Sequence, residues 1–211
     1  RKNAWETYDK SQEKKVMKLA EQYRQFISTG KTERECVRLT EKMAREAGYI
    51  SLEEALTSGD TLKPGDKVYA IHKKKLAVLF QIGTEPLEKG MNILGAHIDS
   101  PRLDLKQNPL YEDGEMALLD THYYGGIKKY QWAAIPLALH GVVARKDGTV
   151  VELAIGEDPS DPVLGISDLL IHLSGEQLQK KAAVVVEGEN LNIIVGSKPL
   201  KSKKDKEKKE L

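Results

Sequence analysis

The sequence predicts an α/β fold that turns β-rich in its second half. Two segments with helical spacing come first, and strand-like runs ending in a short apolar run at residues 91–99 follow them. Helices followed by strands of this kind are typical of the start of an α/β layer. From residue 103 onward, short β-like runs punctuated by glycines replace the helical pattern. We therefore expect a domain boundary near residue 102.

The first two helices are expected at residues 11–27 and 32–47, where apolar side chains recur at helical spacing. Thr32 and Glu35 form a capping-box pattern at the start of the second helix. Ser51 begins a further short helix with the same pattern. We interpret these helices as packing elements with solvated charged faces.

Two strands are predicted at residues 67–72 and 76–82, joined by the lysines at 73–75 as a charged hairpin tip. The apolar run that follows, bounded by Gly90 and Pro101, predicts a buried strand in the centre of the layer.

In the second half, Asp147-Gly148 lies between two apolar runs and predicts a hairpin. The other expected elements are strands within 132–144, 149–155, 182–186 and 191–195, and a short helix within 166–173. The lysine-rich segment 198–211 contains almost nothing apolar and is expected to be flexible.

The composition of the chain argues against several classes of protein. The 211 residues carry a formal net charge of +1, which argues against a general nucleic-acid binder. The single Cys36 excludes an intramolecular disulfide and fits a reducing compartment. No apolar run is long enough to span a bilayer, and the N-terminal residues lack the apolar core of a signal peptide. We expect a soluble cytoplasmic protein without a membrane partner.

The end of the predicted strand at 91–99 carries the candidate site. Side chains two residues apart on a strand project to the same side, so His97 and Asp99 should lie together. A metal-binding imidazole commonly gives its second ring nitrogen to a carboxylate, which fixes its tautomer. A core histidine that caps a strand is the simpler alternative, and the three residues alone do not decide between them.

Three segments in sequence order extend this observation: Gly95 to Leu103, Thr121 to Gly126, and Leu169 to Leu173. Together they resemble the M18 metallo-aminopeptidases, the family of aspartyl aminopeptidase and vacuolar aminopeptidase I. The resemblance covers the N-terminal portion of such a protein. It implies a fold in which the start of a zinc-exopeptidase α/β/α peptidase domain, residues 1–102, is followed by an inserted β-rich dimerisation domain, residues 103–197.

The resemblance also implies an activity, which is release of N-terminal amino acids from peptides by a water that two divalent metal ions activate. Zinc is the expected metal, with cobalt or manganese as alternatives. His97 matches the first metal ligand, and Asp99 matches the carboxylate that orients it. His172 matches a histidine that contacts substrate in a neighbouring subunit or binds metal. Its simpler alternative is a polar residue on a short amphipathic helix.

In the family, the general-base glutamate and the remaining ligands lie downstream of the inserted domain, so this chain is expected to lack them. The pair Glu53-Glu54 precedes the His97 segment at a helix start and is rejected as the base. The family also implies a homo-oligomer, a dodecamer built from dimers. The competing hypothesis from a different class is a non-catalytic β-rich oligomerisation or interaction module, in which His97 and Asp99 are structural.

Overall fold

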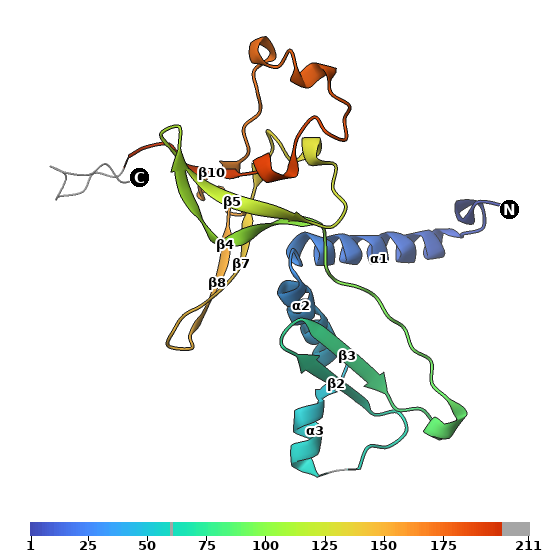
Figure 1. Cartoon of the computed structure of the whole chain (residues 1–211). Coiled ribbons are helices and arrows are strands. Elements are labelled where there is room, and N and C mark those ends of the chain that lie inside the picture. The colour runs from blue at the N-terminus through green and yellow to red at the C-terminus, as the bar shows by residue number, and fades with distance from the viewer. Residues whose placement is uncertain (60, 200–211) are drawn as a thin grey trace. The chain divides into compact units, whose positions relative to one another are not determined.

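The computed structural model describes residues 1–59 and 61–199 as a mixed α/β structure (Figure 1). The chain divides into two compact units, Arg1–Ser100 and Pro101–Leu211. The assignment of these units to a peptidase domain and an inserted dimerisation domain stays a prediction.

The helices of the first unit begin where polar caps occur in the sequence. They are η1 (Ala4–Glu6), α1 (Lys10–Thr29), α2 (Glu33–Glu46) and α3 (Leu52–Ser58). The predicted capping box at α2 is confirmed, since the Thr32 hydroxyl accepts from the Glu35 N–H at 3.3 Å and Glu35 accepts from the Thr32 N–H at 2.9 Å. Ser51 caps α3 in the same way.

A three-stranded sheet in the order β1-β2-β3 follows these helices. The strand β1 (Ile50–Ser51) pairs parallel to β2 (Lys67–His72), and β2 pairs antiparallel to β3 (Leu76–Gln81). The predicted hairpin is therefore confirmed. Its lysine tip turns tightly, with positive φ at Lys73 and Lys74.

The core of the first unit lies between α2, α3 and β2. Its buried side chains are Cys36, Val37, Ala44, Ala55, Val68 and Tyr69. Tyr69 is only 2% exposed, and its hydroxyl donates to the Glu41 carboxylate at 2.7 Å. Burial, together with this hydrogen bond, raises the pKa of Tyr69 to about 12.

The predicted buried strand at residues 91–99 is wrong for this structure. These residues form no strand within the described chain, and Figure 1 draws them as part of an extended connection. Ile93 is 80% exposed and Leu94 is fully exposed. The prediction rested on apolar composition, but a buried strand also requires hydrogen-bonded neighbours, and this segment has none among the described strands.

The helix α1 was expected to pack through an apolar face, yet none of its residues is buried. Met17, Leu19, Tyr23 and Ile27 remain exposed. The predicted helix is therefore confirmed in its secondary structure, whereas its apolar face is only partly covered in the described chain, where Val16 and Phe26 are half-buried.

The second unit is built mainly from strands. A five-stranded sheet has the order β4-β5-β10-β9-β6, and β7 and β8 form a separate hairpin. The bounds are β4 (Arg102–Asp113), β5 (Met116–Tyr124), β6 (Pro136–Leu137), β7 (Leu139–Ala144), β8 (Val150–Ile155), β9 (Leu164–Gly165) and β10 (Ile193–Gly196). The hairpin predicted from Asp147-Gly148 is confirmed, with Leu139 opposite Ile155.

A small apolar core supports this sheet. Leu164, Ile166, Leu191 and Ile193 are buried together. Beside them, the fully buried Thr121 hydroxyl donates to the Leu191 carbonyl at 2.5 Å. The loop before β10 is thereby fixed to β5.

Other expectations for the second half need correction. The helix predicted within 166–173 is reduced to the single turn η4 (Ile171–Leu173), and residues 182–186 form turns instead of a strand. The remaining short turns are η2 (Leu87–Lys89), η3 (Lys129–Gln131), η5 (Gln177–Gln179) and η6 (Gly188–Asn190). From residue 200 on, the lysine-rich segment 198–211 lies outside the described residues.

Candidate metal centre

His97 and Asp99 lie together even without a sheet around them. The His97 Nδ1 atom is 3.1 Å from Asp99 Oδ1 and 3.1 Å from the Asp99 carbonyl oxygen. Both partners are acceptors, so Nδ1 must carry the hydrogen and donate it. In the neutral imidazole, the Nε2 atom then keeps its lone pair, which is the arrangement that a metal-binding imidazole requires. The pair therefore fits one imidazole ligand of a metal ion, together with its orienting carboxylate.

The surroundings leave this imidazole open to solvent. The His97 side chain is 85% exposed, and the Asp99 side chain is 39% exposed. Extended backbone places side chains two residues apart on the same side, which brings the pair together locally. Among residues 1–59 and 61–199, the hydrogen-bond contacts of this ring are with Asp99, which therefore sets its orientation there.

The ends of the first two sequence motifs, Gly95 to Leu103 and Thr121 to Gly126, contact each other. In the second unit, Arg102 pairs across the β4-β5 ladder with Tyr124, and its guanidinium lies 4.3 Å from the centre of that ring. Gly125 has φ +77°, and a Cβ placed there would lie 3.5 Å from Pro101. A glycine at position 125 therefore suits both the positive φ and the close approach of the backbone to Pro101.

His172 lies in the second unit, on the exposed η4 turn. Its neighbours Leu170, Ile171 and Leu173 are exposed as well. The alternative in which these side chains pack one face of an amphipathic helix does not hold for this turn. The metal and substrate roles considered for His172 stay predictions.

Within residues 1–59 and 61–199, no group of three or more His, Cys, Asp or Glu side chains is close enough to hold a metal ion. The His97-Asp99 pair could supply one ligand and the carboxylate that orients it. A centre with two metal ions would need ligands from outside this set.

Glu54 has a structural role, as expected from its position at a helix start. It accepts hydrogen bonds from the Ser51 N–H at 2.8 Å and from Arg45 at 3.3 Å. The Ser51 hydrogen bond, followed by that from Arg45, lowers the pKa of Glu54. A carboxylate held in its charged form by a helix cap is unsuited to accept a proton from water at neutral pH.

A charged cluster in the second unit was missed by the sequence analysis. The register of β4 against β5 shifts between Leu105 and Leu110, and Lys106 lies in this irregular stretch. Its Nζ atom is 2.9 Å from Glu189 and 3.2 Å from Asp120. The hydrogen bond to Glu189, followed by that to Asp120, raises the pKa of Lys106. The sequence holds no signal for it, because the partners are far apart along the chain.

The remaining histidines have local contacts. His140 Nε2 is 3.0 Å from Glu157, and the exposed His122 ring stacks on Tyr123 with 5.4 Å between the ring centres. His72 is exposed at the end of β2.

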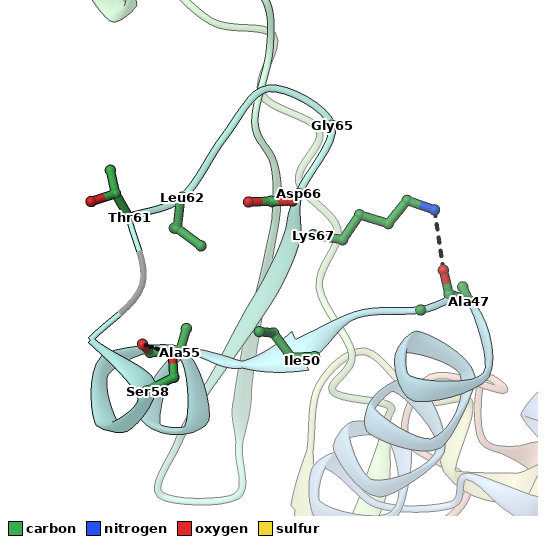
Figure 2. A pocket seen from close by; sticks show the side chains of 10 residues that line it. Ala47, Ile50, Ala55, Ser58, Thr61, Leu62, Gly65, Asp66 and Lys67 are labelled. Carbon is green, nitrogen blue, oxygen red and sulfur yellow. Dashed lines mark hydrogen bonds between the residues drawn. The ribbon is translucent and has the colours of Figure 1, made fainter.

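A hollow at the edge of the first unit is separate from His97. Figure 2 shows it between the end of α2, β1, α3 and the turn before β2. The Lys67 ammonium donates to the Ala47 carbonyl at 3.1 Å, and Asp66 accepts from the Lys63 N–H at 2.7 Å. Its charged groups are engaged by the backbone, and none of the lining residues is a histidine or a cysteine.

Among the described residues, no helix combines the length and apolar character that crossing a membrane requires.

Comparison with known proteins gives a consistent result. Residues 26–211 match the family described as aminopeptidase I zinc metalloprotease (M18). A probable M18 family aminopeptidase 1 of Clostridium acetobutylicum is 59% identical over 207 residues, which are 98% of this chain and 44% of the relative. The crystal structure of the Thermotoga maritima M18 aminopeptidase superposes with a TM-score of 0.86 at 42% identity, and the match covers 97% of this chain and 43% of that one.

A more distant neighbour, the mApe1 dodecamer of Saccharomyces cerevisiae, has a TM-score of 0.62 at 21% identity, which shows a shared fold alone. The chain therefore spans less than half the length of the curated relative and of the solved structures that it matches.

Proposed function

The chain belongs to the M18 family of aminopeptidases, and from this premise we propose that it is the N-terminal portion of a metal-dependent enzyme that releases N-terminal amino acids from peptides. The observation that carries the proposal is the His97-Asp99 pair. It lies within the matched residues, and its geometry leaves Nε2 available for a metal ion.

His97 and Asp99 have distinct roles in this proposal. His97 holds one of two divalent metal ions, with zinc as the expected metal and cobalt or manganese as alternatives. Asp99 accepts the Nδ1–H hydrogen bond, which fixes the neutral tautomer and raises the basicity of Nε2. Metal ions at such a centre polarise the scissile carbonyl and lower the pKa of a bound water. The general base and the other ligands would come from residues outside these 211.

His172 is proposed to act across a subunit interface. The side chain is exposed on η4 among exposed apolar neighbours, as a residue that reaches another subunit would be. There it would contact the peptide substrate or a metal ion. The yeast neighbour, which shares this fold, was solved as a dodecamer. We propose that this protein also forms a homo-oligomer built from dimers. A reducing compartment, the cytoplasm, suits the free Cys36 thiol.

The test is release of N-terminal residues from a panel of acidic and neutral aminoacyl substrates by the complete gene product, with and without added zinc or cobalt. We expect metal-dependent activity that His97→Ala abolishes and that Asp99→Asn lowers by roughly 10- to 100-fold. His72→Ala, which changes an exposed histidine on β2, is the matched control and should retain activity.

The panel also identifies the preferred N-terminal residue, acidic or neutral. Inactivity of a folded, metal-loaded complete protein would contradict the proposal. It would favour the non-catalytic oligomerisation or interaction module, in which His97 and Asp99 are structural.

A further inference from the structure

Arg102 follows the candidate ligand pair closely in the sequence and is held from two directions. Its Nε atom donates to Asp104 Oδ1 at 2.7 Å, and its guanidinium lies 4.3 Å from the centre of the Tyr124 ring. Asp104 stands two residues further along β4, and Tyr124 lies directly opposite Arg102 on β5. The three side chains therefore share one face of the β4-β5 ladder. The Arg102 side chain is only 29% exposed.

The shape of the guanidinium explains how it makes both contacts at once. It is flat, so its edge can donate to a carboxylate while its face stacks on an aromatic ring. We call Arg102, Asp104 and Tyr124 the Arg102 clamp. Beside it, Gly125 lets the backbone approach Pro101, since a Cβ there would lie 3.5 Å from that proline. The first residues of the second unit are thus fixed to the end of β5.

Few rotatable bonds separate the clamp from Asp99. Only Ser100 and Pro101 lie between Asp99 and Arg102 in the sequence. The proline ring locks its own φ, and a residue that precedes proline is restricted to extended conformations, which applies to Ser100. A clamp that fixes Arg102 therefore also restricts where the backbone of Asp99 can lie.

The position of Asp99 matters because it sets the orientation of the His97 ring. His97 Nδ1 lies 3.1 Å from Asp99 Oδ1 and 3.1 Å from the Asp99 carbonyl oxygen. The His97 side chain is 85% exposed, so little packing restrains it. A shift of Asp99 would turn the ring and with it the direction of the Nε2 lone pair.

We propose that Arg102 is a positioning residue for the metal ligand His97. Through its pair with Asp104 and its stack on Tyr124, Arg102 holds the chain so that Asp99 stays within reach of His97 Nδ1. In this role it does not itself contact the metal. The inference rests on the proposed function for the use of His97 as a ligand, whereas the contact between His97 and Asp99 exists without metal.

The test compares the complete gene product with its Arg102→Met variant, which keeps an apolar side chain but removes the charge and the flat guanidinium. We expect the dissociation constant for zinc, measured by competition with a chelating dye, to rise about 10-fold, the lower end of the loss caused by removing a group that orients a metal ligand. The value of kcat/KM should fall at limiting zinc and recover at saturating zinc. Arg145→Met, at an exposed arginine in the turn between β7 and β8, is the matched control and should change neither quantity.

Two further variants test the contacts themselves. Arg102→Lys keeps the charge but has no flat group to stack on Tyr124, so its zinc affinity should lie between those of the unaltered protein and Arg102→Met. It also gives the comparison if Arg102→Met does not fold. Tyr124→Leu removes the ring and should weaken zinc binding too. Because both changes break one contact, the double variant should lose less than the product of the two single losses.

Crystal structures of the complete protein without metal separate this inference from the proposed function. The contact between His97 Nδ1 and Asp99 should persist in the unaltered protein and be lost in Arg102→Met. An unchanged contact would overturn the inference, as would unchanged zinc affinity in folded Arg102→Met.

A lower midpoint of thermal unfolding with unaltered zinc binding would also overturn it, because Arg102 would then only stabilise the sheet. If the unaltered protein binds no zinc, the proposed function fails. The metal-free crystals then decide the role of Arg102, since loss of the contact in Arg102→Met supports it and an unchanged contact refutes it.

Discussion

The side chain of Tyr69 connects the sheet of the first unit to helix α2. It is buried against α2, and its hydroxyl hydrogen-bonds to Glu41 on that helix. The Arg45 guanidinium lies 5.2 Å from the centre of its ring and 3.6 Å from Glu41. One residue thus joins the sheet to the helix by packing, by a hydrogen bond and by a cation–π contact.

We predict that Tyr69→Phe lowers the free energy of unfolding at pH 7 by about 1–2 kcal/mol, because Glu41 loses its hydrogen-bond donor. The pKa of Tyr69 is raised in the folded state, to about 12. Its contribution is therefore fully present below the unfolded pKa of about 10 and is lost as pH rises from there through the folded value. Urea unfolding between pH 7 and 11.5 measures both effects. An equally steep loss above pH 10 in Tyr69→Phe would contradict this assignment.

Gly188 is required by a close approach in the second unit. A Cβ at this buried glycine would collide with the Tyr123 ring on β5. We predict that Gly188→Ala lowers the free energy of unfolding by about 1–3 kcal/mol, because the ring and the η6 turn must move apart. Thermal unfolding gives the comparison. Gly141→Ala, where a Cβ meets open space, is the control and should be neutral or slightly stabilising. Equal effects would refute the steric explanation.

At the scale of elements, helices and hairpins that depend on local signals were predictable from the sequence, whereas strands that depend on distant partners were not. The helices α1, α2 and α3 begin at polar caps, and the β2-β3 and β7-β8 hairpins form around turns, so each was predictable from neighbouring residues. Residues 91–99 and 182–186 have strand-like composition without strand partners. A strand is defined by what lies beside it, and local composition does not contain that information.

The cap of α2 can be tested directly. We predict that Thr32→Ala lowers the free energy of unfolding by about 1 kcal/mol, because the Glu35 N–H loses its acceptor at the start of the helix. Urea unfolding followed by circular dichroism measures the change. Thr57→Ala removes an exposed threonine from α3 and should change stability by less than about 0.5 kcal/mol. A Thr32 variant as stable as this control would show that the capping box contributes nothing.

For the whole molecule, the contact between His97 and Asp99 was more predictable from the sequence than the packing around it. The spacing of His97 and Asp99 predicted their contact, and the three motifs indicated the family to which the chain belongs. The exposure of His97, the partly covered face of α1 and the Lys106 cluster were not predictable, because burial and ion pairs depend on residues far away in the sequence. The first unit thus holds the proposed ligand beside its carboxylate, and the apolar side chains of Met91, Ile93 and Leu94 just before it are exposed.

The most direct test of the central claim is the zinc content of the complete gene product after dialysis, for the unaltered protein and for His97→Ala. We predict about two zinc ions per chain in the unaltered protein and at most about one in His97→Ala. The control His122→Ala, at an exposed histidine on β5, should keep the full content. Unchanged zinc in folded His97→Ala would contradict the assignment of His97 as a metal ligand.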